Sequence, residues 1–136
     1  MAAIRQIGPC ILIGHSQGGG LAAHAANKAG DLVHACVFLE PHGAPATFDS
    51  AAIAGKPCLT VDGDYLDRDA FWRDLTARSA AMRREWARAG GIADHCNLVA
   101  RGLYGNSHMM MDRNSDAVLE QVISWLNHCA EKGVLS

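Results

Sequence analysis

The sequence predicts an α/β protein built on roughly four parallel strands, with helices on both faces of the sheet. Short segments that are wholly apolar alternate along the chain with longer segments of helical periodicity. Strands of that composition need helices on both sides to bury them, which is the arrangement of a parallel sheet. The 136 residues are enough to form one core, so a single domain is expected over residues 1–136.

The first half of the chain is expected to form a strand, a helix and a second strand. Residues 9–14 are a short apolar run and predict the first strand. Residues 19–29 are rich in alanine and predict a helix, for which Gly30 is a suitable stop. Residues 32–39 form the second apolar run, and a loop over residues 40–50 should follow it.

The second half continues the alternation. Residues 57–62 predict the third strand, and residues 69–89 predict one long helix or two short ones that end at Gly90. Residues 96–101 are the fourth apolar run and predict the last strand. Residues 115–130 place apolar side chains at helical spacing, which predicts an amphipathic helix. The connections between parallel strands should be right-handed crossovers.

Composition and charge narrow the function classes. The formal net charge is −2, which gives no electrostatic footprint for nucleic acid or for an anionic membrane. The arginine-rich stretch 78–88 is most simply a solvated helix face. No apolar run approaches a membrane span, and the N-terminus lacks the apolar core of a signal peptide. A cytoplasmic protein is therefore the default expectation.

The cysteines favour buried thiols over a metal site. The chain holds Cys10, Cys36, Cys58, Cys96 and Cys129. Their number is odd and none forms a Cys-x-x-Cys pair, so no zinc site is expected. Four of the five fall in predicted strands, where small apolar side chains are common. A disulfide between Cys58 and Cys96 is an alternative in an oxidising compartment.

Residues 14–18 form the most informative motif, Gly-His-Ser-Gln-Gly, between a predicted strand and a predicted helix. That context makes G-x-S-x-G credible as a nucleophile elbow, in which a sharp, strained turn presents the Ser16 hydroxyl at the carboxyl end of the sheet. Flanking glycines are expected to avoid collisions there. The Gln17 backbone N–H, at the helix start, would point toward a developing oxyanion. A plain glycine-rich turn is the simpler alternative, and a phosphate-binding loop is weaker because no lysine follows the glycines.

A serine nucleophile needs a general base, and seven histidines compete for that role. Packing or solvent contact accounts better for three of them, His24, His34 and His128. His15 is a neighbour of the site within the motif, and His42 lies in a nearby loop and stays a candidate. His95 is expected just before the last strand, at the wrong end of the sheet. His108 follows that strand and returns to the carboxyl end, which makes it the favoured base.

Two loops offer the carboxylate that would hold the base in its working tautomer. Glu40 ends the second strand, and Pro41 should restrict it to an extended backbone. The third strand is followed by a group of aspartates, Asp62, Asp64 and Asp67. The residue pattern leaves both loops open.

Four segments together resemble the C-terminal half of bacterial α/β-hydrolase esterases. They are IGHSQGG, VFLEPHGAP, VDGDY and GNSHMMMDRNSD. The resemblance implies a partial α/β-hydrolase fold and an ester as the small-molecule substrate, with no cofactor and no metal. It matches Ser16 to the nucleophile, His108 to the base and Glu40 to an unusual acid, with Asp64 as the alternative acid. Methionines 109–111 could line an acyl pocket or simply pack at the last helix.

The resemblance also implies about four further strands before the first strand of this chain. The second oxyanion donor comes from a loop after one of those strands, so turnover by the chain alone is expected to be weak. An inert hydrolase-like fragment, or a subunit that needs a complementary N-terminal half, is the alternative. A ligand-binding module without catalysis is a third. The first strand should lie at a bare sheet edge and favour self-association.

Overall fold

The computed structural model describes residues 2–135 and contains a four-stranded parallel sheet in the order β1-β2-β3-β4. The strands are β1 (Cys10–His15), β2 (Val33–Leu39), β3 (Pro57–Asp62) and β4 (Ile92–Asn97). All three pairings are parallel, so the predicted α/β class with four parallel strands is confirmed.

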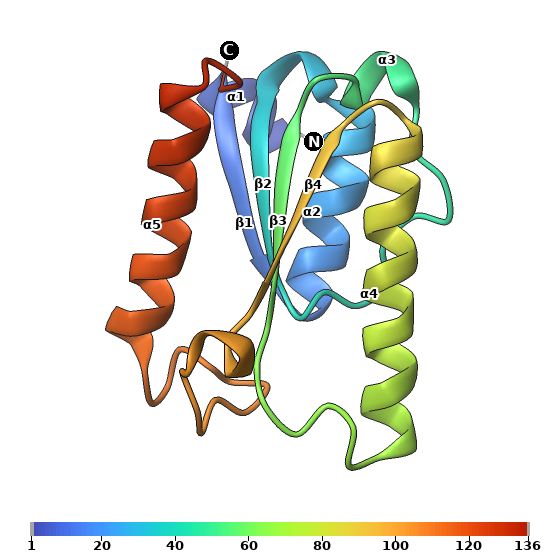
Figure 1. Cartoon of the computed structure of the whole chain (residues 1–136). Helices are drawn as coiled ribbons and strands as arrows, with labels where there is room; N and C mark the ends of the chain where they lie inside the picture. The colour runs from blue at the N-terminus through green and yellow to red at the C-terminus, as the bar shows by residue number, and fades with distance from the viewer. Residues whose placement is uncertain (1, 136) are drawn as a thin grey trace.

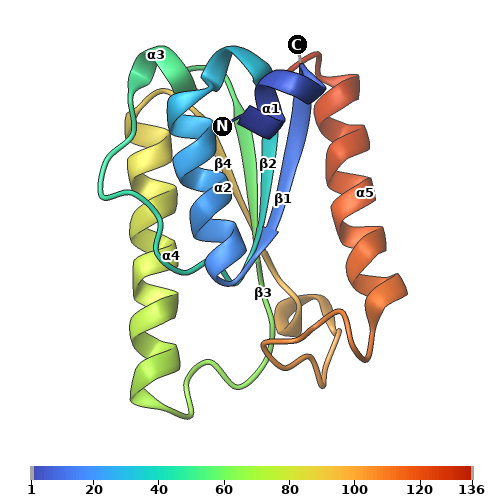
Figure 2. The same cartoon turned by 180° about the vertical axis from the view of Figure 1, so that it is seen from behind.

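The helices form two layers around the sheet (Figure 1). The main helices are α2 (Gln17–Lys28), α4 (Ala70–Arg88) and α5 (Ser115–Glu131). Helices α2 and α4 cover one face and α5 covers the other, which the view from behind also shows (Figure 2). Shorter elements are α1 (Ala2–Ile7), α3 (Ser50–Ile53), η1 (Gly30–Leu32) and η2 (Val99–Arg101). Across residues 2–135, every helix is too short or too polar to pass through a bilayer.

Two hydrophobic clusters hold the layers together. On the α2/α4 face, Trp86 and Phe38 are fully buried and their rings meet edge to face at 5.9 Å. On the α5 face, Val37 and Leu98 are fully buried and pack with Val118 and its neighbours. Successive residues of β2 therefore point into different clusters, as expected for a strand that is covered on both sides.

The carboxyl ends of the strands meet at one edge of the sheet, drawn at the bottom of Figure 1. The turn from β1 into α2, the loop after β2, the loop after β3 and the long loop between β4 and α5 all gather there. In open parallel sheets this edge is where ligands bind.

The position of β4 differs from the prediction. The apolar run 96–101 was expected to be the strand, but β4 spans Ile92–Asn97 and residues 99–101 form a 3₁₀ turn. Two polar side chains of β4 have partners on neighbouring elements, one on β3 and one on α5. His95 lies 2.8 Å from Asp62, and Trp125 donates to Asp94 at 2.7 Å. His95 therefore lies within the last strand and not before it.

The cysteines are all free thiols, and Cys10, Cys36, Cys58 and Cys96 lie in strands as predicted. The alternative of a Cys58–Cys96 disulfide is wrong. Cys58 belongs to the cluster on the α2/α4 face, whereas Cys96 belongs to the cluster on the α5 face. The sheet separates the two sulfur atoms, and a disulfide needs Cβ atoms about 4 Å apart.

Burial of the thiols predicts a loss of stability at alkaline pH. Burial raises the pKa of Cys36 from 9.0 to about 12, with a smaller contribution from the nearby Cys10 thiol. Burial also raises the pKa of Cys58. The folded state holds these protons more tightly than the unfolded state does. Their stabilisation is thus complete below about pH 9 and is lost as the pH rises toward 12. Urea unfolding at about pH 7 and pH 10.5 should show this loss. A Cys36→Ala/Cys58→Ala variant should lose less stability over the same range, and an equal loss would contradict the assignment.

The edge position predicted for the first strand is confirmed, since β1 pairs only with β2 within residues 2–135. Ile11 and Ile13 on this strand are 38% and 59% exposed, and Leu21 on α2 is 70% exposed. Unpaired apolar edges recruit other strands. We therefore expect the average mass in light scattering to rise with protein concentration. Ile13→Lys should reduce this rise, and a wild-type chain that stays monomeric at high concentration would contradict the prediction.

Candidate active site

Ser16 lies at the sharp turn between β1 and α2, with φ 54° and ψ −124°. A non-glycine residue with positive φ is strained, and such strain is typical of functional sites. A Cβ atom on Gly14 would lie 2.5 Å from the carbonyl oxygen of Gly18, so residue 14 must be glycine. The same expectation for Gly18 is wrong, because a Cβ atom there would meet nothing within 4 Å.

The next two glycines let the loop after β2 pack directly on α2. A Cβ atom on Gly19 would lie 2.9 Å from the Pro41 side chain, and one on Gly20 would lie 2.0 Å from the His42 carbonyl oxygen. The His42 N–H donates to the Ser16 carbonyl at 2.8 Å. The glycines after Ser16 therefore bring the loop that follows Glu40 against the serine turn.

At the start of α2, next to the serine, the Gln17 N–H has no hydrogen-bond acceptor among residues 2–135. Gln17 is the first residue of α2, and the first four N–H groups of a helix have no acceptor within it. The Ser16 N–H is already used, because it donates to the Leu39 carbonyl at 2.9 Å. The Gln17 N–H, together with the positive end of the helix dipole, can thus stabilise negative charge beside Ser16.

His108 and Glu40 form a close pair at this edge. His108 Nδ1 lies 2.6 Å from Glu40 Oε2, and the two side chains are 21% and 6% exposed. The Gly63 N–H donates to the other oxygen, Glu40 Oε1, at 2.8 Å. An ionised carboxylate can only accept, so the proton of a neutral imidazole sits on Nδ1 and leaves Nε2 free as a base.

The backbone of Glu40 is not extended, contrary to the expectation from the following proline. Its φ is 41°, in the left-handed region. The Glu40 N–H donates to the Val61 carbonyl at 3.0 Å, which continues the pairing with β3, and the side chain turns toward Gly63. These contacts outweigh the local preference set by Pro41 and hold a second strained residue at the site.

The aspartates that competed with Glu40 have other partners. Asp62 is buried at the end of β3 and contacts His95, and Asp67 accepts from Arg73 through its backbone carbonyl. Asp64 accepts from the Gly105 N–H at 2.7 Å, and its own N–H donates to the Asn106 carbonyl at 2.7 Å. Asp64 therefore fastens the loop that carries His108.

The serine and the histidine are not joined directly. Among the hydrogen bonds of residues 2–135, none links the Ser16 hydroxyl to His108. Such bonds are often loose before a substrate binds. A cavity of about 280 Å³ lies beside His108 and is bordered by Trp72, Tyr65 and Met109. Met110 is fully buried in the core, so only part of the methionine run faces the site.

Trp72 was missed by the sequence analysis. Its ring centroid lies 4.7 Å from that of His108, although Trp72 comes from α4, which is far away along the chain. An aromatic residue in the first turn of a helix is the only local signal, and it does not specify a contact. His42 packs its ring against Phe71, and His24 lies 3.1 Å from the Gly43 carbonyl.

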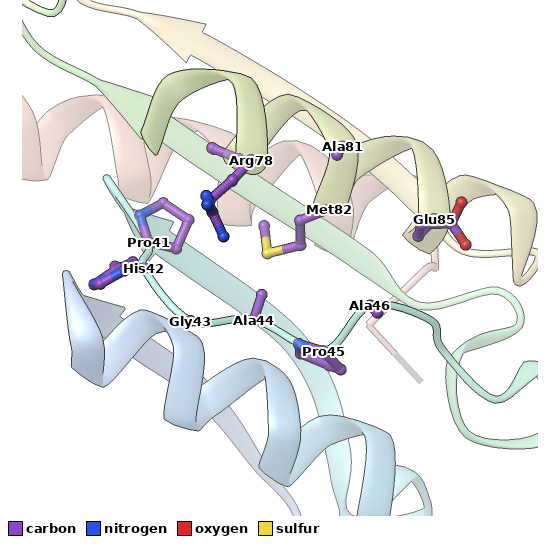
Figure 3. A pocket seen from close by; sticks show the side chains of 11 residues that line it. Pro41, His42, Gly43, Ala44, Pro45, Ala46, Arg78, Ala81, Met82 and Glu85 are labelled. Atoms are coloured by element: carbon purple, nitrogen blue, oxygen red, sulfur yellow. The ribbon is translucent and has the colours of Figure 1, made fainter. Parts of the chain in front are cut away.

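A second cavity, of about 250 Å³, lies between the 41–46 loop and α4 (Figure 3). Figure 3 shows Arg78 and Met82 projecting from the helix toward Pro41 and His42. The cavity is mostly apolar and borders the loop that contacts the serine turn. Within residues 2–135, no three histidine, cysteine, aspartate or glutamate side chains converge to hold a metal ion.

The fold and the turn around Ser16 define a parallel α/β protein with a sharp, strained turn between a strand and a helix. A family model for the alpha/beta hydrolase fold matches residues 5–117. The chain belongs to the α/β hydrolase fold family. Among solved structures it is similar to a novel bacterial esterase, with 27% sequence identity and a TM-score of 0.79. The match covers 93% of this chain and 40% of the esterase chain, so this chain spans about two fifths of that protein's length. The comparison with curated proteins found no match.

Proposed function

We propose that this chain carries the catalytic groups of a serine ester hydrolase, with Ser16 as nucleophile, His108 as general base and Glu40 as the acid. The observation that carries the proposal is the 2.6 Å contact between His108 Nδ1 and Glu40 Oε2, at the same sheet edge as the strained Ser16. The similarity to a bacterial esterase supports an ester as substrate.

The reaction proceeds through an acyl-enzyme. Ser16 Oγ forms a bond to the ester carbonyl carbon while His108 Nε2 takes the hydroxyl proton. The carbonyl oxygen becomes an oxyanion, which the Gln17 N–H stabilises. Collapse of this intermediate breaks the bond to the alcohol, and the proton on His108 passes to the leaving oxygen. Water then attacks the acyl group by the same route and releases the carboxylic acid, so no metal or organic cofactor takes part.

Glu40 acts through His108. Its carboxylate keeps the Nδ1 proton in place and stabilises the imidazolium that forms when Nε2 takes the serine proton. The Gly63 N–H holds the far oxygen of the carboxylate, so that the near oxygen faces the imidazole. The closeness of Gly63 to both Glu40 and the Asn106 carbonyl leaves no room for a side chain there.

We expect the purified chain to hydrolyse short-chain nitrophenyl esters slowly. The proposal assigns one oxyanion donor within residues 2–135, the Gln17 N–H, and a hole that lacks one donor loses about 10²- to 10³-fold in rate. The release of nitrophenol should disappear in Ser16→Ala. Hydrolysis above the uncatalysed rate that is equally fast in the wild type and in Ser16→Ala would refute the assignment of the nucleophile.

A second candidate is a hydrolase domain that is inert alone and needs further strands at the free edge of β1. The bare β1 edge and the missing contact between Ser16 and His108 within residues 2–135 favour this candidate. The same assay separates the two, because an inert domain would fold normally and release no nitrophenol above the Ser16→Ala background.

A further inference from the structure

The residue before the nucleophile contacts the loop that carries the base. His15 Nε2 lies 2.7 Å from the backbone carbonyl oxygen of His108, across 93 positions of sequence. A carbonyl oxygen can only accept, so Nε2 of His15 carries the proton and donates it. His15 is the last residue of β1, which makes it a rigid anchor next to Ser16.

The loop that carries His108 is anchored before and after it, through the buried Asn106, which accepts from Asn114, and through the buried Met110. Asp64 fastens it at Gly105 and Asn106, whereas Ser107 and Met109, on either side of His108, are exposed. The side chain of His108 is held by Glu40, and its backbone is held by His15. Without His15, the Glu40 carboxylate would be the one group within residues 2–135 that hydrogen-bonds to His108.

The imidazole of His108 also packs against two rings. Its centroid lies 4.5 Å from that of His15 and 4.7 Å from that of Trp72, with interplanar angles of 43° and 44°. Two rings in contact limit the rotation of the imidazole about its side-chain bonds. Packing against Trp72 therefore restricts the imidazole, and Glu40 sets its tautomer.

We propose that His15 is a positioning residue, which fixes His108 relative to Ser16 through its hydrogen bond to the His108 carbonyl. This inference rests on the proposed function. His15 touches no reacting atom in that mechanism, so its effect is on geometry. A displacement of about 1 Å at a reacting group can cost about 10²-fold in rate.

Two substitutions test the N–H donor and the aromatic ring of His15 separately. His15→Phe keeps an aromatic ring and removes the N–H donor, whereas His15→Gln keeps an N–H donor and removes the ring. His24→Leu is a matched control, because His24 makes the same type of contact, to the Gly43 carbonyl at 3.1 Å, away from His108.

The decisive test is NMR of the chain with ¹⁵N-labelled histidine. In the wild type we expect His15 in the Nε2–H tautomer and a slowly exchanging Nδ1 proton on His108. The His108 signal should shift or broaden in His15→Phe and persist in His15→Gln and His24→Leu. A wild-type His15 in the Nδ1–H tautomer, or an unchanged His108 signal in His15→Phe, would overturn the proposal. The tautomer of His15 is measured on the wild type, so this part of the test does not depend on the folding of a variant.

The reactivity of Ser16 is the second readout. The rate of labelling by a fluorophosphonate should fall about 10- to 100-fold in His15→Phe and change by less than about threefold in His15→Gln. If the folded wild type does not react at all, the proposed function fails while the NMR result still decides the role of His15. Equal loss in both variants, with no change in the His108 signal, would reduce His15 to a packing residue.

Discussion

Glu40→Gln is expected to slow the reaction of Ser16 with a fluorophosphonate by about 10³- to 10⁴-fold. The two oxygens of Glu40 accept from different donors, the Gly63 N–H and His108 Nδ1. A glutamine can satisfy only one of them with its carbonyl. If the glutamine carbonyl accepts from the Gly63 N–H, the glutamine amide N–H faces His108 Nδ1. Nδ1 must then accept, which places the imidazole proton on Nε2. That tautomer cannot take a proton from Ser16.

Asp64→Asn is the matched control for this prediction. Asp64 accepts from the Gly105 N–H through one oxygen, and an asparagine carbonyl can accept the same bond. The other oxygen, Oδ1, is buried without a partner among residues 2–135. The substitution should therefore cost less than about tenfold in labelling rate. The opposite order, with Asp64→Asn as the damaging change, would make Asp64 the acid.

Gly20→Ala is expected to destabilise the fold by about 3 kcal/mol, the upper part of the range for overpacked sites. The new methyl group would lie 2.0 Å from the His42 carbonyl oxygen and 2.8 Å from the Gly43 carbonyl carbon. Both contacts are with backbone, which cannot rotate away. The loop after Glu40 would have to move, and the bond from the His42 N–H to Ser16 would break.

Gly18→Ala provides the control two residues earlier in the same helix. Nothing lies within 4 Å of a Cβ atom at Gly18, and alanine is the better helix former by up to about 1 kcal/mol. Urea unfolding should therefore show a lower midpoint for Gly20→Ala and an equal or higher midpoint for Gly18→Ala. Equal effects of the two substitutions would contradict the packing described for this turn.

The fold class was predictable because the signal was strong. Segments that are apolar on both faces, such as residues 32–39, are typical of the buried strands of a parallel sheet. The last strand was misplaced because it contains polar residues, whose partners lie on other elements. His95 contacts Asp62, and Asp94 accepts from Trp125. Leu98, which belongs to the apolar run, is buried just beyond the strand. In the centre of the sheet the paired strand residues are also the buried ones, whereas in the edge strand β4 half of the paired residues are exposed.

The residues of the candidate site could be proposed from the sequence as far as their chemistry was local. The Ser16 turn carries its own signature, the position after the last strand favoured His108, and the family resemblance favoured Glu40. The structure brings His108 and Glu40 within 2.6 Å of each other. The contacts that surround His108 were not predictable, because Trp72 and the donor role of His15 depend on tertiary packing. The positive φ of Glu40 could likewise not be predicted from the sequence, since it depends on pairing with β3.

The most direct test of Ser16 as the nucleophile is the intact mass of the folded chain after exposure to a fluorophosphonate, followed by peptide mapping. We expect one adduct, on Ser16, and none on Ser16→Ala under the same conditions. No adduct on a chain shown to be folded, or an adduct on another residue, would contradict Ser16 as an activated nucleophile.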